Sequence, residues 1–236
     1  QGSAILHADE TGWREDGQNG YIWVFSTPGE EALRYFHYDH SRGQQVVEAV
    51  LGERFQGVLG SDFYGGYNGY RGRHQRCWRH LLGDLHDLKA EHPDEATVQE
   101  WAQAVRALYD RAIAFVRGGE PGPEERQRLY VTLWKEVWQL GLCYAQAEHP
   151  CQALAKRLLR HQDELFTFVL VAGLAADNNL AERSLRPLVV VRKISGGSRS
   201  PQGSQTRMTL ASVFATLKAR GLNPFAACLA LIGSNS

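Results

Sequence analysis

The stretch "AILHADETGWREDGQNGYIWVFST", residues 4–27, decides the fold because it reads as two strands joined by a turn. Its first part, "AILHAD", is a short apolar run that ends at Asp9, and its last part, "YIWVFST", alternates aromatic and aliphatic residues, a pattern typical of strands. Two pairs between these runs favour a turn, Asp16-Gly17 and Asn19-Gly20. With a third strand predicted at "ALRYFHYD", 32–39, the chain should open as an antiparallel meander.

A helix and a returning strand are predicted after the meander. The segment "SRGQQVVEAVLGERF", 41–55, has an N-cap candidate in Ser41 and an apolar stripe that ends before Gly52. The segment "GVLGSD" that follows is a second short apolar run, and it ends at Asp62. A strand that returns through a helix lies parallel to the first strand by a right-handed crossover. We therefore expect Asp9 and Asp62 side by side at one edge of the sheet.

Helices are predicted for most of the remaining chain. Between about 94 and 171, three helical stretches carry apolar stripes over 98–115, 129–140 and 154–168, which indicates a helical subdomain; the same spacing also fits coiled-coil packing. Strands followed by helices, with an inserted helical block, describe an α/β or α+β domain. The C-terminal part is predicted as a short helix broken at Pro187, a strand-like run at 188–194, a glycine-serine loop at 195–204, and a helix that ends at Gly221.

Length and composition favour a globular protein. The chain has 236 residues, 43% of them hydrophobic, enough to bury a core in one large domain or in one domain with an insertion. No apolar run approaches the roughly 20 residues that cross a bilayer, and no secretion leader is evident, so we expect a cytoplasmic protein without membrane contact. Four cysteines without a C-x-x-C pair indicate reduced thiols. Gln1-Gly2-Ser3 resembles a cleavage scar or a cut inside a longer protein.

The charge distribution is uneven along the chain although the formal net charge is zero. All 26 acids lie at or before Glu182, whereas residues 183–236 contain eight bases and no acid. The C-terminal quarter is therefore a candidate surface for a polyanion, and a solvated basic surface is the alternative interpretation.

Three acids from separate parts of the chain could hold metal ions. Mg²⁺ prefers carboxylate oxygens, and two such ions about 3.5–4 Å apart stabilise the attacking and leaving oxygens of a phosphodiester displacement. Asp9 and Asp62 each end an apolar run, and Glu182 on a late helix could complete the site. Each acid also has a simpler interpretation: Asp62 as a cap or turn residue, Asp9 and Glu10 as an exposed pair, and Glu182 as the ion-pair partner of Arg186.

Five segments resemble the catalytic region of IS66-family insertion-sequence transposases. They are "ADETGW" around Asp9, "GVLGSDFYGGYN" around Asp62, "QRCWRHLLGDL" at 75–85, "NNLAERSLRPLVVVRKISGGSRS" at 178–200 and "GLNPF" at 221–225. The resemblance runs over nearly the whole chain, although the helical middle contributes little to it.

This resemblance implies a ribonuclease-H-like α/β fold, in which helices flank a mixed five-stranded sheet and a helical insertion precedes the last catalytic acid. The first part of the catalytic domain would span 4–92, the α-helical insertion 93–172, and the remainder with a basic DNA-facing segment 173–230. Asp9 on the first strand, Asp62 on the fourth strand and Glu182 on a helix would form a DDE triad. The triad would bind Mg²⁺, with Mn²⁺ as a substitute.

The implied activity is metal-dependent DNA cleavage and strand transfer during transposition of an insertion sequence. Transposon ends and target DNA would be the partners of a homo-oligomer at the bacterial nucleoid, and upstream DNA-binding and zinc-binding segments that family members carry are missing from this sequence. Two alternatives remain: a ribonuclease-H-like nuclease without strand transfer, and a catalytically silent DNA-binding domain.

Other residues near these segments have predicted roles. Glu10 or Asp177 could replace a member of the triad. Asn178 and Asn179 either contact backbone or cap a helix, and capping is the preferred interpretation. Cys77 and His80 could ligate zinc, but a packed cysteine and a hydrogen-bonded histidine are the preferred interpretation. The backbone amides of the loop 196–198 could approach phosphate, and five side chains are predicted to bind DNA: Arg183, Arg186, Arg192, Lys193 and Arg199.

Overall fold

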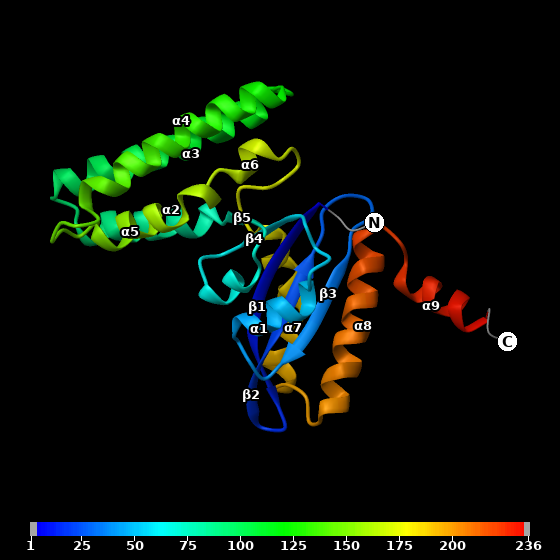
Figure 1. Ribbon diagram of the computed structural model, residues 1–236. Coiled ribbons are helices and arrows are strands. Elements are labelled where there is room, and N and C mark those ends of the chain that lie inside the picture. Colours follow the sequence, from blue (N-terminus) through cyan, green and yellow to red (C-terminus); the bar gives the residue numbers. More distant parts are fainter. Residues whose placement is uncertain (1–3, 234–236) are drawn as a thin grey trace. The chain divides into compact units, whose positions relative to one another are not determined.

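A computed structural model describes residues 4–233 (Figure 1). Gln1 to Ser3, where a cleavage scar is expected, lie outside the described residues. The chain divides into two compact units: the first contains the residues up to Gly72 and those from Asn178 onward, and the second runs Arg73–Asp177. The expected helical insertion at 93–172 lies within the second unit.

A mixed five-stranded sheet has the strand order β3-β2-β1-β4-β5. β1 pairs antiparallel with β2 and β2 with β3, whereas β1 pairs parallel with β4. The predicted meander and the parallel return of the fourth strand are therefore confirmed. The strands are β1 (Ile5–Glu15), β2 (Gln18–Ser26), β3 (Arg34–Asp39), β4 (Val58–Ser61) and β5 (Arg73–Arg76).

The β1–β2 hairpin turns at Asp16 and Gly17. Both residues have positive φ, 48° and 76°, as tight two-residue hairpin turns require. The turn expected at Asn19-Gly20 is wrong, because both residues lie inside β2. Gly20 makes room for a ring from the neighbouring strand: a β-carbon there would lie 2.3 Å from the hydroxyl oxygen of Tyr38.

The first unit buries a separate apolar cluster on each face of its strands. On one face, Leu6 and Ala8 pack against α1 (Gln44–Leu51), and on the other Trp13 packs against α7 (Asn179–Ser195). Figure 1 shows α1 and α7 on opposite sides of the strands. Successive side chains of a strand point to opposite faces, so even-numbered residues of β1 face α1 and odd-numbered residues face α7.

The helix α7 runs unbroken through Pro187, so the predicted break at Pro187 and the predicted strand at 188–194 are wrong. Ala181, Leu185 and Leu188 recur at helical spacing and are buried against the strands. This burial outweighs the strand preference of the valines at 189–191. Pro187 lies on the exposed side of the helix, where its ring costs a backbone hydrogen bond but does not disturb the packing.

Two helices begin at residues other than those predicted. α1 follows Gly43 rather than Ser41, because the Ser41 hydroxyl accepts a hydrogen bond from the Gly43 amide, 2.9 Å, in the preceding turn. α8 (Pro201–Ala219) begins inside the predicted glycine-serine loop, where the Ser200 hydroxyl caps it by accepting from the Gly203 amide. The predicted end near Gly221 is confirmed, and α9 (Pro224–Gly233) follows.

Hydroxyl groups of α8 bind the backbone of β3, the first strand in the sheet order. The Ser212 hydroxyl accepts a hydrogen bond from the Phe36 amide, 2.9 Å, and the Thr216 hydroxyl accepts one from the Arg34 amide, 3.0 Å. Backbone amides left unpaired at a sheet edge can pair with a strand of another chain. The bonds from α8 occupy these two amides and so protect the β3 edge from such pairing. Ser204 and Met208 continue the same row at intervals of four residues.

The second unit is mainly helical, and helices are confirmed at the three stretches predicted between 94 and 171, except that a 3₁₀ turn after residue 161 divides the third stretch, 154–168. Its helices are α2 (Trp78–Glu91), α3 (Ala96–Arg117), α4 (Pro123–Tyr144), α5 (Gln152–His161) and α6 (Thr167–Leu170). Across the described part of the chain, the cysteines are all free, as expected, and none of the helices has both the length and the apolar character to cross a membrane.

A buried ion pair stabilises the second unit. Arg76 is 1% exposed, and its guanidinium forms an ion pair with Glu164. Glu164 ends the 3₁₀ turn Gln162–Glu164, and its carboxylate also accepts a hydrogen bond from Nδ1 of His161, 2.8 Å away. Burial alone would raise the pKa of Glu164, but the hydrogen bond of His161 and the charge of Arg76 outweigh it and lower the pKa to about 2.

We predict that Glu164→Gln lowers the free energy of unfolding by about 2 kcal/mol at pH 7, because it removes a negative charge that pairs with a buried arginine. The folded-state pKa lies below the ordinary value of 4.5, so this contribution is complete above about pH 4.5 and is lost as the pH falls towards about 2. Urea unfolding of both proteins at pH 7 and pH 3 measures it. An equal difference at the two pH values would contradict the assignment.

Candidate active site

The strands of the first unit bring Asp9 level with Asp62. Asp9 lies in the middle of β1, and Asp62 follows β4 directly. The parallel pairing sets His7 opposite Gly60, and two residues further along each strand are Asp9 and Asp62. Glu182 lies in the first turn of α7, on the face of β1 towards which Asp9 points.

Glu10 occupies the opposite face of β1 and is held by other groups. Its carboxylate accepts hydrogen bonds from the hydroxyl of Tyr67 and from the guanidinium of Arg42, whose Nε lies 2.9 Å away. The Arg42 guanidinium also lies over the ring of Tyr64, 4.0 Å from its centroid. Although Glu10 is next to Asp9 in sequence, its side chain belongs to this arginine–tyrosine cluster.

The charges around Asp9 change its acidity. Burial first, and then the neighbouring charge of Glu10, raise the pKa of Asp9 to about 7, and the charges of Asp62 and Glu182 add to the shift. The backbone amide of Glu10, 3.0 Å from Asp9 Oδ1, acts in the opposite direction. The structure therefore brings the three predicted acids near enough to interact electrostatically. In the described residues, however, the ligand oxygens of these three acids do not all lie within 4.8 Å of one another.

The simpler interpretation of Asp62 as a turn residue is also correct in part. Asp62 Oδ1 accepts a hydrogen bond from the backbone amide of Tyr64, 2.9 Å, which orders the chain after β4. Asp177, the alternative third acid, belongs to the second unit. There burial, followed by the charge of Asp177, raises the pKa of Tyr109 on α3.

Asn178 and His7 fix the start of α7 on β1. Asn178 occupies the N-cap position without a side-chain cap bond, so the predicted capping role is wrong. Its Nδ2 donates to the carbonyl of Ala8, 2.7 Å, and its Oδ1 lies 3.3 Å from Nδ1 of His7. Both side chains are 1% exposed. The sequence interpretation missed this pair, although His7 lies two residues before Asp9 on a strand and Asn178 four residues before Glu182 on a helix.

The basic residues predicted to bind DNA differ in their surroundings. Arg183, Arg186 and Lys193 are exposed on α7, and Arg199 is exposed in the loop after it. Arg192 is partly buried, and its Nη1 donates to the Thr11 hydroxyl, 3.0 Å, and to the Gly12 carbonyl. Arg192 therefore also holds the C-terminal half of α7 to β1.

The loop at 196–198 uses its backbone amides internally, contrary to the predicted contact with phosphate. The Gly196 amide donates a hydrogen bond to the backbone carbonyl of Arg192, 2.8 Å, and the Ser198 amide donates one to the backbone carbonyl of Arg14, 2.8 Å. The Gly197 amide donates to the hydroxyl of Ser195, 3.4 Å. These bonds place the loop against the end of β1 and leave its amides occupied.

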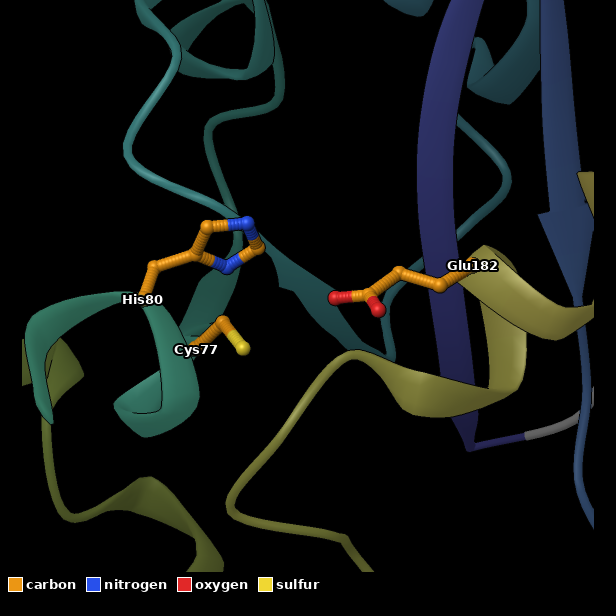
Figure 2. A group of neighbouring side chains, drawn as sticks. All are labelled: Cys77, His80 and Glu182. Atoms are coloured by element: carbon orange, nitrogen blue, oxygen red, sulfur yellow. The ribbon is translucent and has the colours of Figure 1, made fainter. Parts of the chain in front are cut away.

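Figure 2 shows Cys77, which precedes α2, and His80, in the first turn of α2, together with Glu182 of α7. Cys77 and His80 belong to the second unit, and Glu182 belongs to the first. Cys77 is buried, as expected for a packed cysteine, and the His80 side chain is exposed.

The fold and the acidic cluster define an α/β protein that carries three carboxylates: one within a strand, one directly after the neighbouring strand, and one on a covering helix. The chain belongs to the IS66 family of transposases, because the family model described as "Transposase IS66 family" matches residues 1–206.

Two proteins of Sinorhizobium fredii (strain NBRC 101917 / NGR234) are similar in sequence. "Uncharacterized protein y4qI" is 24% identical over 205 residues, 80% of this chain and 38% of the relative. "Uncharacterized protein y4jO" is 27% identical over 152 residues, 64% of this chain and 46% of the relative. The chain therefore spans less than half the length of these curated relatives.

We predict that Gly60→Ala disturbs the anchor of α7, because a β-carbon there would lie 2.7 Å from Nδ1 of His7. The expected loss is about 1–3 kcal/mol of unfolding free energy. Gly83→Ala is the control, since a β-carbon at this exposed helical position meets nothing within 4 Å and should stabilise slightly. Thermal unfolding of both variants measures the difference, and equal stability of the two would contradict the anchor.

Proposed function

We propose that this chain is the catalytic domain of a DDE transposase with a ribonuclease-H-like fold, which cleaves DNA and joins strands during transposition of an insertion sequence. The observation that carries the proposal is the acidic cluster around Asp9: burial first, and then the charge of Glu10, raise the pKa of Asp9, and the charges of Asp62 and Glu182 add to the rise. Repulsion among acids is unfavourable in the folded protein, and a bound cation would relieve it. Membership of the IS66 transposase family supports the same activity.

The donor set suits Mg²⁺, with Mn²⁺ as a substitute. Mg²⁺ takes oxygen ligands and is usually bound by one or two carboxylates together with water and substrate phosphate. Asp9, Asp62 and Glu182 would hold the metal ions. When bound, such ions supply Lewis-acid stabilisation of charge on the reacting phosphate oxygens.

The protein contributes rigid positions for these ligands. Asp9 lies on β1, the central strand of the sheet, and Asp62 is fixed by its bond with the Tyr64 amide. The start of α7 is tied to β1 by Asn178, so the Glu182 side chain is presented from a fixed first turn. A carboxylate beside the scissile phosphate can also accept a hydrogen bond from an attacking water or hydroxyl and so orient it. We assign that orienting role to Glu182.

The exposed cations of α7 are proposed to hold DNA. Arg183, Arg186 and Lys193 follow Glu182 along the helix, and Arg199 follows the helix itself. Guanidinium groups bind phosphate oxygens through paired hydrogen bonds, so the strand would run along α7 past the acids. Arg192 contributes charge, but we expect its first role to be the attachment of α7 to β1. Transposon ends and target DNA are the proposed substrates of a homo-oligomer, and the bacterial nucleoid is the proposed location.

We predict Mg²⁺- or Mn²⁺-dependent cleavage and 3′-hydroxyl-dependent joining on transposon-end DNA of the element that encodes the chain. Asp62→Asn and Glu182→Gln should each lower both rates by at least about a hundredfold. Asp177→Asn should retain them. Cleavage without any joined product would favour a nuclease, and salt-dependent DNA binding without cleavage would favour a catalytically silent domain.

We predict that Asp9→Asn stabilises the metal-free protein while it abolishes activity. The pKa of Asp9 is about 7 in the folded protein against an ordinary value of 3.8, so stability falls as the pH rises between these values. At pH 8 in EDTA the variant should be more stable by on the order of 2 kcal/mol, and at pH 4 the gain should vanish. Thermal unfolding at both pH values measures this, and a variant that is no more stable at pH 8 would contradict the acidic cluster.

We predict that the double variant Arg183→Ala, Arg186→Ala weakens DNA binding and lowers the slope of log affinity against log salt by about 2, roughly 0.9 for each lost phosphate contact. Arg160→Ala, an exposed arginine on α5 of the second unit, is the control for loss of charge alone. Fluorescence anisotropy at several salt concentrations measures both slopes. Equal slopes for the double variant and the unaltered protein would exclude α7 as the phosphate-binding face.

A further inference from the structure

A groove between the end of β3 and the first half of α8 has no part in the proposed reaction. It has a volume of about 700 Å³ and is lined by residues that include Glu15, Tyr38, Asp39, His40, Ser204 and Met208. Within the described part of the chain, the lining contains two acids and no lysine or arginine, so the groove favours a cation over a phosphate. Its distance from the acid cluster is large, because Glu15 lies six residues beyond Asp9, about 20 Å along β1.

Two residues that line this groove each carry a buried polar atom that has no hydrogen-bond partner among the described residues. These atoms are Oε2 of Glu15 and the hydroxyl of Ser204, whose residues are 4% and 1% exposed. A buried carboxylate oxygen without a partner is costly. Two such atoms at one groove indicate that a ligand supplies the missing interaction.

A histidine stands next to the same carboxylate. His40 Nε2 lies 3.4 Å from Oε1 of Glu15. Two ligands bound at about 2.0–2.1 Å to a tetrahedral Zn²⁺ ion are about 3.4 Å apart. The separation of the nitrogen and the oxygen therefore matches two ligands of one ion.

The orientation of His40 is fixed by a neighbouring residue. Its other ring nitrogen, Nδ1, lies 3.3 Å from the hydroxyl of Tyr38, and metal-binding histidines usually bond their second nitrogen to such a partner. The Tyr38 hydroxyl itself lies over Gly20, where a side chain would collide with it. The ligand nitrogen is thus held in place before any ion arrives.

We propose that this groove binds a divalent transition-metal ion of the Zn²⁺ class, with Glu15 and His40 as ligands and the Ser204 hydroxyl and water completing the coordination. A nitrogen ligand disfavours Mg²⁺ and suits Zn²⁺. The ion would join three elements, since Glu15 ends β1, His40 follows β3 and Ser204 lies near the start of α8. The site is independent of the proposed function.

Calorimetric titration with Zn²⁺, in excess Mg²⁺ and after treatment with EDTA, tests the site. The side chain of His40 is 59% exposed, so His40→Ala should fold, and it should bind one Zn²⁺ fewer per chain than the unaltered protein. Glu15→Gln should lose the same ion, and Tyr38→Phe should weaken its binding about tenfold. His37→Ala is the control, because His37 on β3 also lines the groove but its Nε2 lies 3.7 Å from Asp39 Oδ2 rather than beside Glu15, and this variant should bind as the unaltered protein does.

Titration with Co²⁺ separates this site from any thiolate site elsewhere. The absorption lost in His40→Ala should be that of nitrogen and oxygen ligands, without a thiolate charge-transfer band. Equal Zn²⁺ stoichiometry for His40→Ala and the unaltered protein would overturn the proposal, and so would an equal loss in His37→Ala. Asp9→Asn should retain the Zn²⁺ site, so its behaviour distinguishes this proposal from failure of the proposed catalytic site.

Discussion

A carboxylate that is partly buried among other carboxylates is the constraint on which the first unit depends. The position of Asp9 on β1 removes it from much of the solvent. This burial first, and then the charges of the acids around it, raise the pKa of Asp9 to about 7. Such an arrangement opposes folding at neutral pH, so the surrounding bonds must offset it. Such destabilising burial and repulsion of charged groups occur in proteins at sites that need them for binding or catalysis.

The bonds that offset this repulsion attach α7 to β1 along much of its length. Asn178 bonds the Ala8 carbonyl before the first turn, and Arg192, about four turns further along the helix, bonds Thr11 and Gly12. Between them, Leu185 is buried against the strands. The helix that presents Glu182 is therefore fixed at both ends and in the middle, and its charged face remains free of this packing.

The early part of the fold could be predicted from sequence because its signals are local. Alternating residues predicted the strands of the meander, and the apolar run before Asp62 predicted a strand that returns parallel to β1. Together these two predictions placed Asp9 beside Asp62. The prediction failed at 188–194, where a row of valines favours a strand but burial of Leu185 and Leu188 favours a helix. The roles of Glu182 and of the other two acids came from the family resemblance, and they stay predictions.

The contacts that sequence could not predict join residues far apart in the chain. The position of Asn178 before a helix predicted a cap, yet its side-chain amide donates to the backbone of β1. Only the folded structure brings these two segments together. The backbone amides at 196–198 were predicted to approach phosphate, yet the Ser198 amide donates a hydrogen bond to the Arg14 carbonyl at the end of β1. Glu15, His40 and Ser204 meet in one groove although 189 residues of sequence separate the first from the last. No periodic pattern connects them.

Anomalous diffraction from crystals of this chain soaked in Mn²⁺ tests the central claim most directly. We predict Mn²⁺ density bonded to carboxylate oxygens of Asp9 and Asp62, with Glu182 turned towards the same ion or its neighbour. Ordered Mn²⁺ found only at other positions, with these three carboxylates directed away from one another, would contradict it.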